Sequence, residues 1–287
     1  MLKTKRIHQY SIALLCLTLV HRHCEARSNP MENLREIASC LAMTNSHKAM
    51  VSNMSEPRTK ISFNQDWKFY LGDNTNAKQA TFNDLKWRKL NLPHDWSIEG
   101  AFDEKNPAKP EGGGLPTGIG WYRKSFMMPT SVTQKVTYIE FDGVYKNSEV
   151  WINGKYLGKR PYGYISFRYE LSKYLKPGKN VIAVRVDNSA QPDSRWYSGS
   201  GIYRNVWLVS TSKIAVEHWG TTVNASVNIK GGADGKDMGL VHVETRIKNK
   251  SGKQQQVSVS TAVYDFNNKL VEKIILTRLM STPQEPA

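Results

Sequence analysis

Residues 41–287 contain no cysteine. The three cysteines of the chain are Cys16, Cys24 and Cys40, all within the first forty residues. This distribution excludes a disulfide framework and a cysteine-based metal site in the larger part of the chain. That part must be held together by packing, for which the eight Trp and 13 Tyr of the chain supply large side chains.

Metal-ligand spacing is also missing among the seven histidines. His21 and His23 do lie beside Cys24, but this trio falls in a segment without sustained periodicity, and we interpret it as incidental. The sequence therefore predicts no metal site and no cofactor.

Dense runs of basic residues are absent, although the formal net charge is +15. Residues 1–60 hold nine Lys/Arg and four Asp/Glu, and the remaining positive residues are scattered along strand-like segments. No zinc-finger or helix-turn-helix spacing accompanies them. We therefore expect a basic but soluble surface and no nucleic-acid partner.

Long apolar runs are absent as well. The most apolar segment is Ile12–Val20. It follows Lys3, Lys5 and Arg6, and this order is typical of a signal peptide. It is too short for a stable membrane span. We expect a leader over residues 1–60, largely disordered after the signal-like segment, and a periplasmic or secreted protein. A poor cleavage region leaves a cytoplasmic location open.

Residues 61–211 show short β-like runs with little helix. Lys135 to Phe141 alternates, and Val150 to Leu157 predicts a hairpin whose turn is Asn153-Gly154. The Gly/Pro-rich stretch Gly100 to Gly120 predicts a loop. Such a series of strands favours a β-sandwich.

Residues 212–287 have a different pattern. Val241 to Lys248 and Val257 to Tyr264 alternate cleanly between apolar or β-branched and polar side chains, which is typical of an immunoglobulin-like sandwich. A complete domain of that kind needs about 100 residues. We therefore predict an all-β chain: a leader, a first sandwich, and an incomplete second one.

The connection between the runs Val181–Val186 and Ile202–Val209 is the most informative stretch. It gathers Asp193, Arg195, Trp196 and Tyr197 in an irregular loop. An aromatic face can cover the C–H side of a sugar ring while Asp and Arg bond its hydroxyls. The same aromatics could instead plug the end of the sandwich, and spacing alone leaves both interpretations open.

The chain resembles glycoside hydrolase family 2, most closely its Bacteroides-type β-galactosidases, over roughly residues 61 to 287. The motifs that carry the resemblance are Phe63-Asn-Gln-Asp-Trp-Lys-Phe69, Leu92-Pro-His-Asp-Trp-Ser-Ile98, Gly118-Ile-Gly-Trp-Tyr-Arg-Lys124, Phe141-Asp-Gly-Val-Tyr145, Val150-Trp-Ile-Asn-Gly154, Arg160-Pro-Tyr-Gly-Tyr164 and Ser194-Arg-Trp-Tyr-Ser-Gly-Ser-Gly-Ile-Tyr-Arg-Asn-Val-Trp207. The resemblance implies a jelly-roll sugar-binding domain at residues 61–211 and the start of an immunoglobulin-like domain at 212–287. It implies a β-galactoside or related glycan as the partner.

The resemblance also implies a set of sugar-contacting residues. In the family, loops of the sugar-binding domain reach the mouth of a catalytic barrel. The matching positions are Asp95, Trp96, Arg195 and Trp196, with Asp193 as a weaker candidate. Tyr122, Trp151 and Trp207 lie in strand-like runs, and we expect them in the core.

The family's catalytic carboxylates have no counterpart here. Family 2 enzymes are retaining glycosidases that use two carboxylates on a (β/α)₈ barrel of roughly 250 residues. The family's Asn-Glu pair does not occur in this sequence, nor does an alternating βα pattern. We assign no catalytic residue and expect no hydrolysis by this chain alone.

Three hypotheses follow. The chain is the amino-terminal portion of a family 2 enzyme, whose barrel is truncated away or encoded elsewhere. Alternatively it is a free-standing carbohydrate-binding module, or an inactive gene remnant. The DNA downstream of Ala287 would distinguish the second from the other two.

Overall fold

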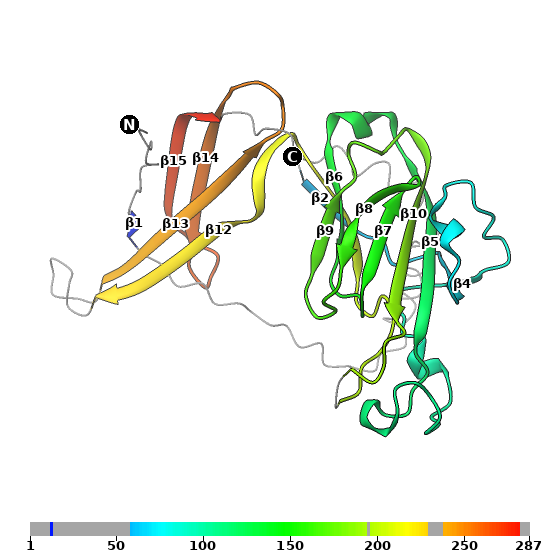
Figure 1. The fold of residues 1–287 in the computed structure, drawn as a ribbon. Coiled ribbons are helices and arrows are strands. Elements are labelled where there is room, and N and C mark those ends of the chain that lie inside the picture. The colour runs from blue at the N-terminus through cyan, green and yellow to red at the C-terminus, as the bar shows by residue number, and fades with distance from the viewer. Residues whose placement is uncertain (1–11, 14–57, 194–195, 229–237, 282–287) are drawn as a thin grey trace, which may run out of the picture. The chain divides into compact units, whose positions relative to one another are not determined.

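A computed structural model of the protein describes residues 12–13, 58–193, 196–228 and 238–281 (Figure 1). The chain divides into two compact units, one comprising the described part of Ala38–Ser212 and one the residues from Lys213 onward together with strand β1. Of the predicted leader, only Ile12, Ala13 and residues 58–60 lie within the described residues. The rest of the signal-like segment lies outside them.

The first unit contains ten strands joined by loops and short 3₁₀ turns. The strands are β2 (Arg58–Ser62), β3 (Trp67–Leu71), β4 (Arg88–Leu90), β5 (Gly118–Met128), β6 (Val136–Phe141), β7 (Ser148–Ile152), β8 (Lys155–Arg160), β9 (Phe167–Glu170), β10 (Gly178–Asn188) and β11 (Val206–Thr211). The 3₁₀ turns are η3 (Thr75–Lys78), η4 (Ser97–Glu99), η5 (Pro110–Gly112) and η6 (Thr130–Gln134). None of the helices in the described part has the length and apolar content that a membrane crossing requires.

These strands form two antiparallel sheets. One has six strands in the order β4-β3-β5-β10-β7-β8, and the other has four in the order β2-β11-β6-β9. The longest pairing joins β5 and β10, with Gly118 opposite Asn188 at one end and Met128 opposite Gly178 at the other. The predicted all-β fold is confirmed.

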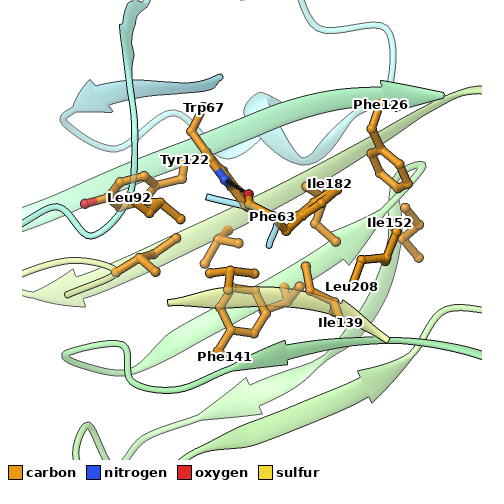
Figure 2. Close-up of a cluster of buried hydrophobic side chains, with 14 of the residues drawn as sticks. Phe63, Trp67, Leu92, Tyr122, Phe126, Ile139, Phe141, Ile152, Ile182 and Leu208 are labelled. Atoms are coloured by element: carbon orange, nitrogen blue, oxygen red, sulfur yellow. Dashed lines mark hydrogen bonds between the residues drawn. The ribbon is translucent and has the colours of Figure 1, made fainter. Parts of the chain in front are cut away.

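The hydrophobic core lies between the two sheets (Figure 2). Side chains that alternate inward from the strands fill it, among them Trp67 and Tyr122 from the six-stranded sheet and Ile139 and Phe141 from the four-stranded sheet, with Phe63 from the segment after β2. Trp67 is fully buried, and its indole N–H donates to the carbonyl oxygen of Phe63 at 2.7 Å. The buried ring thus keeps its polar atom satisfied.

The outer face of the six-stranded sheet is also covered. Trp121 and Trp151 stack there with ring centroids 5.3 Å apart, packed with Ala77 of η3 and Ala183 of β10. Of the three residues that we expected in the core, Tyr122 and Trp151 are 0% and 7% exposed, whereas Trp207 is only half-buried. Because β5 and β10 are buried on both faces, this sheet is a rigid support for the loops at its ends.

The predicted hairpin is present. Strands β7 and β8 are joined at Asn153-Gly154, where φ is 50° and 81°. Both values lie in the left-handed region that a type I′ turn requires, which asparagine and glycine adopt most readily.

The predicted loop over Gly100 to Gly120 ends earlier than expected, because strand β5 already begins at Gly118. A Cβ at Gly120 would lie 2.7 Å from the Trp96 ring and 2.9 Å from the Phe69 ring. Glycine is present because two aromatic side chains press against the strand, not because the chain turns there.

The second unit is built from long antiparallel pairs. Its strands are β1 (Ile12–Ala13), β12 (Ile214–Asn228), β13 (Met238–Asn249), β14 (Gln255–Tyr264) and β15 (Leu270–Ser281). They form a three-stranded sheet in the order β1-β13-β12 and a pair β14-β15. The two segments with clean alternation lie on β13 and β14, as the period of two predicts.

Candidate functional site

The loops before β5 and after β10 lie at the same end of the first unit (Figure 1). Here the segment after β4 is attached to the segment before β11 by backbone hydrogen bonds. The His94 N–H donates to the carbonyl of Ile202 at 2.9 Å, and the Trp96 N–H donates to that of Ser200 at 3.1 Å. Two stretches about 100 residues apart in sequence therefore act as one surface.

Asp95 fixes this junction. Its Oδ1 accepts the backbone N–H of Ser97 at 2.9 Å and that of Ser200 at 2.7 Å. A Cβ at Gly199 would come within 2.0 Å of Oδ2, so only glycine allows the carboxylate to approach this closely. Oδ2 accepts a longer bond, 3.4 Å, from the Tyr197 hydroxyl. One carboxylate oxygen thus stabilises the fold, while the other faces an exposed aromatic residue.

Beside Asp95 lies a group of aromatic side chains, here called the aromatic cluster: Tyr145, Tyr162, Tyr164, Trp196 and Tyr197. Trp196 is 61% exposed, and its indole N–H donates to the Tyr164 hydroxyl at 3.1 Å. The Tyr164 ring centroid is 5.6 Å from that of Tyr162 and 5.2 Å from that of Tyr145. All but Tyr145 keep a large exposed area. The arrangement offers flat apolar surfaces next to hydroxyl and carboxylate groups.

Trp96, in contrast, does not face a ligand. It is 3% exposed and belongs to the hydrophobic core, where its ring stacks on Phe69 at 5.6 Å. This burial contradicts the expectation that Trp96 contacts a sugar, because the side chain packs inward over Gly120. Its burial anchors the segment that carries Asp95 to the core.

Asp193 is engaged by an ion pair with Lys146. Burial lowers the pKa of Lys146, while the charge of Asp187 acts in the opposite direction. The carboxylate of Asp193 is therefore already paired with the ammonium group of Lys146. Arg195 lies outside the described residues.

A polar network lies under the same surface. Arg88 Nη2 is 2.7 Å from His94 Nε2 and, as a guanidinium, can only donate. The His94 proton then lies on Nδ1, which is 2.7 Å from the Tyr122 hydroxyl. Glu99 accepts from Arg88 at 2.7 Å and lies 3.2 Å from His94 Nε2. Burial lowers the pKa of His94 more than the carboxylate of Glu99 raises it.

This network predicts a pH dependence of stability. Because the folded-state pKa of His94 lies below its ordinary value of 6.5, the unfolded chain binds the proton more tightly. Stability is then complete above the unfolded pKa and falls as pH drops through about 6.5. We expect the free energy of unfolding to decrease between about pH 7.5 and 5.5, and this decrease to flatten in His94→Gln.

Chemical denaturation at each pH measures the effect, with His242→Gln in the second unit as the matched control. The Glu99 carboxylate titrates at lower pH, since hydrogen bonding to Arg88 lowers its pKa despite the opposing effect of burial. An equally steep profile in His94→Gln and the parent would show that another group is responsible.

The carboxylates that flank the loops serve the fold. Glu99 pairs with Arg88, and Asp187 pairs with Arg185 at 3.2 Å. In the described ranges there is no group of three or more His, Cys, Asp or Glu that could hold a metal ion.

The sequence predicted Asp95 and Trp196 as parts of one site, but it did not identify Tyr162 and Tyr164. The available signal was the Arg160-Pro-Tyr-Gly-Tyr164 motif, in which proline and glycine predict a turn that exposes two tyrosines. Glycine is required at Gly163, because a Cβ there would lie 2.4 Å from the Tyr145 ring.

Comparison with known proteins gives consistent matches. The model of the sugar binding domain of glycosyl hydrolases family 2 matches residues 61–212. The chain is 50% identical over 221 residues to β-galactosidase BoGH2A of Bacteroides ovatus, covering 77% of this chain and 25% of that protein. It is 47% identical over 191 residues to a putative β-glucuronidase of Formosa agariphila, covering 67% of this chain and 18% of that protein.

A solved structure agrees with these matches. A β-glycosidase from Bacteroides vulgatus superposes with a TM-score of 0.69 at 40% identity, covering 77% of this chain and 28% of that one. The chain spans about a quarter or less of the length of the two curated relatives.

Proposed function

Because the chain belongs to glycoside hydrolase family 2, we propose that its aromatic cluster, with Asp95, contacts the sugar of a β-galactoside on which the whole protein acts. The observation that carries the proposal is the exposure of Trp196 and Tyr197, 61% and 51%, beside a carboxylate fixed by two backbone N–H groups. Large aromatic faces left in water next to a rigid acceptor are typical of ligand sites.

Each group has a separate role in this proposal. The Trp196 ring covers the C–H face of the sugar ring, since this contact removes apolar area from water on both sides. Asp95 Oδ2 accepts a sugar hydroxyl in place of the long bond from Tyr197. The tyrosine hydroxyls of the cluster can donate or accept around the ring. Together they orient the sugar without reacting with it.

Cleavage would require two carboxylates on a barrel, which the family resemblance places after the immunoglobulin-like domain. The binding role can therefore be tested on this chain, and catalysis only in the presence of such a barrel. The β-galactoside is favoured because the 50% identical relative is named a β-galactosidase. A glucuronide is the second candidate, because the 47% identical relative is named a putative β-glucuronidase.

We also propose that the protein is exported, because Lys3, Lys5 and Arg6 precede the apolar segment Ile12–Val20 in the order typical of a signal peptide.

Replacing Trp196 by alanine tests the proposal. Losing the contact of a large ring removes about 2 kcal/mol of apolar burial, so we expect galactose to bind about 30-fold more weakly. Binding to the parent chain is itself weak, with a dissociation constant of about 1 mM or above, because one wall of a site must offset the cost of association. Titration calorimetry with galactose measures both.

Trp219→Ala is the matched control, since Trp219 is 76% exposed and belongs to the second unit. The same loss of affinity in both variants would refute the proposed site. A parallel titration with glucuronic acid distinguishes the two sugar classes. Micromolar galactose affinity that depends on Trp196 would favour the free-standing binding module.

A further inference from the structure

A second candidate site lies at the opposite end of strand β5. A cavity of about 640 Å³ opens where β3 begins and β5 continues past it toward Met128. Four lysines line it: Lys68, Lys89, Lys124 and Lys179. The volume falls in the range of small-molecule sites, about 300–1,000 Å³, and is far larger than a single inorganic ion needs.

The four lysines come from four neighbouring strands, and three of them share one face of the sheet. Lys68 of β3 lies directly opposite Lys89 of β4. Lys179 of β10 lies opposite Met127 of β5, on the same face as Lys68 and Lys89, whereas Lys124 follows Arg123, the residue paired with Lys68, and so points to the other face. Like charges directly opposite each other are unfavourable in a sheet. A ligand that neutralises them would therefore be stabilised here.

The carboxylates around the cavity do not balance this charge. Asp84 accepts Lys68 Nζ at 2.5 Å and Arg123 Nε at 2.9 Å, so one carboxylate serves two cations. Asp66 is the other acidic residue of the lining. Within the described residues, no carboxylate forms an ion pair with Lys89 or Lys179. The cavity therefore has a net positive charge.

Lys124 is the most enclosed of the four, at 6% exposed. Its ammonium lies 4.7 Å above the Phe63 ring and donates to the carbonyl of Gln65. Burial lowers its pKa, with the charge of Asp66 opposing this effect. Lys124 therefore adds positive charge to the lining, while its ammonium is held on the core side of the sheet.

The lining also contains exposed apolar side chains. Leu85 is 81% exposed and Met127 is 58% exposed. Thr81, Asn83 and Ser125 add neutral polar groups. Apolar contacts, hydroxyl partners and cations together fit a ring with hydroxyls and an anionic substituent.

We infer that this cavity binds a saccharide bearing a carboxylate or a sulfate group, independently of the aromatic cluster. The two sites lie at opposite ends of β5, whose ten steps from Gly118 to Met128 span about 33 Å. One sugar ring cannot reach both. Binding at the cavity is therefore independent of galactose binding at the aromatic cluster.

Titration of the full chain with galactose 6-sulfate, glucuronic acid, galactose and inorganic sulfate tests the inference, at an ionic strength of about 0.15 M to screen long-range attraction. The test variant is Lys89→Gln with Lys179→Gln. The matched control is Lys155→Gln with Lys159→Gln, which removes the same charge from two exposed lysines of β8. Circular dichroism verifies that each variant is folded.

We expect at least one anionic sugar to bind about tenfold more tightly than galactose, and the Lys89/Lys179 variant to lose most of that difference. The control variant should retain it. Equal losses in both variants would assign the binding to the overall charge of the chain. Inorganic sulfate binding as tightly as galactose 6-sulfate would reject a saccharide site, as would the absence of any preference for anionic sugars.

Discussion

Replacing Asp84 by asparagine is expected to lower the free energy of unfolding of the first unit by about 3–5 kcal/mol. Arg123 is 1% exposed and relies on Asp84 for its compensating charge, at 2.9 Å. Burial alone raises the pKa of Asp84, but hydrogen bonds from Lys68 and Arg123 bring it below its ordinary value. The variant leaves a buried guanidinium with backbone carbonyls such as that of Gln79 as its acceptors.

Chemical denaturation followed by circular dichroism measures this loss, with Glu104→Gln as the control, because Glu104 is an exposed carboxylate on a loop. A change below about 1 kcal/mol for Asp84→Asn would mean that the backbone carbonyls alone satisfy Arg123.

Trp67→Ala is expected to cost a similar amount, about 3–5 kcal/mol, through the cavity it leaves. Trp67 is fully buried between Phe63 and Tyr122, with ring centroids at 6.0 Å and 6.5 Å (Figure 2). Its indole N–H also satisfies the carbonyl of Phe63. The same denaturation measurement applies.

Trp219→Ala is the control for this loss of stability. Trp219 is 76% exposed, so removing its ring should change stability by about 0.5 kcal/mol or less. Equal effects of the two tryptophan substitutions would contradict the assignment of Trp67 to the core.

Local patterns predicted much of the fold. The Asn153-Gly154 turn and the two-faced strand β6 follow from rules that act over a few residues. In β6, Ile139 and Phe141 enter the core, while Val136 and Tyr138 pack on the outer face, as their alternation indicates. Such features depend on residues that are close in sequence, so they can be predicted from the sequence alone.

Contacts between distant segments could not be predicted in the same way. Trp96 occupies a loop motif that suggests exposure, yet Phe69 and Gly120 place it in the core. The partnership of Asp84 with Arg123 joins residues 39 positions apart. The cationic cavity likewise exists only because β3, β4, β5 and β10 are neighbours in the sheet.

The candidate site combines both kinds of information. The loop after β10 identified Asp193, Trp196 and Tyr197, but only the fold places Tyr164 beside Trp196. Tyr164 reaches the site from the connection between β8 and β9, which no spacing in the sequence relates to the loop after β10.

The most direct test of the central claim, that the aromatic cluster contacts sugar, is mapping of NMR shift changes on the labelled full chain during titration with galactose. We expect the indole N–H of Trp196 and the amides of Asp95, Tyr164 and Tyr197 to move together along one saturable curve. The indole N–H of Trp219 should stay in place, because it belongs to the other unit. Shift changes absent from Asp95 and Trp196 but present elsewhere would contradict the account.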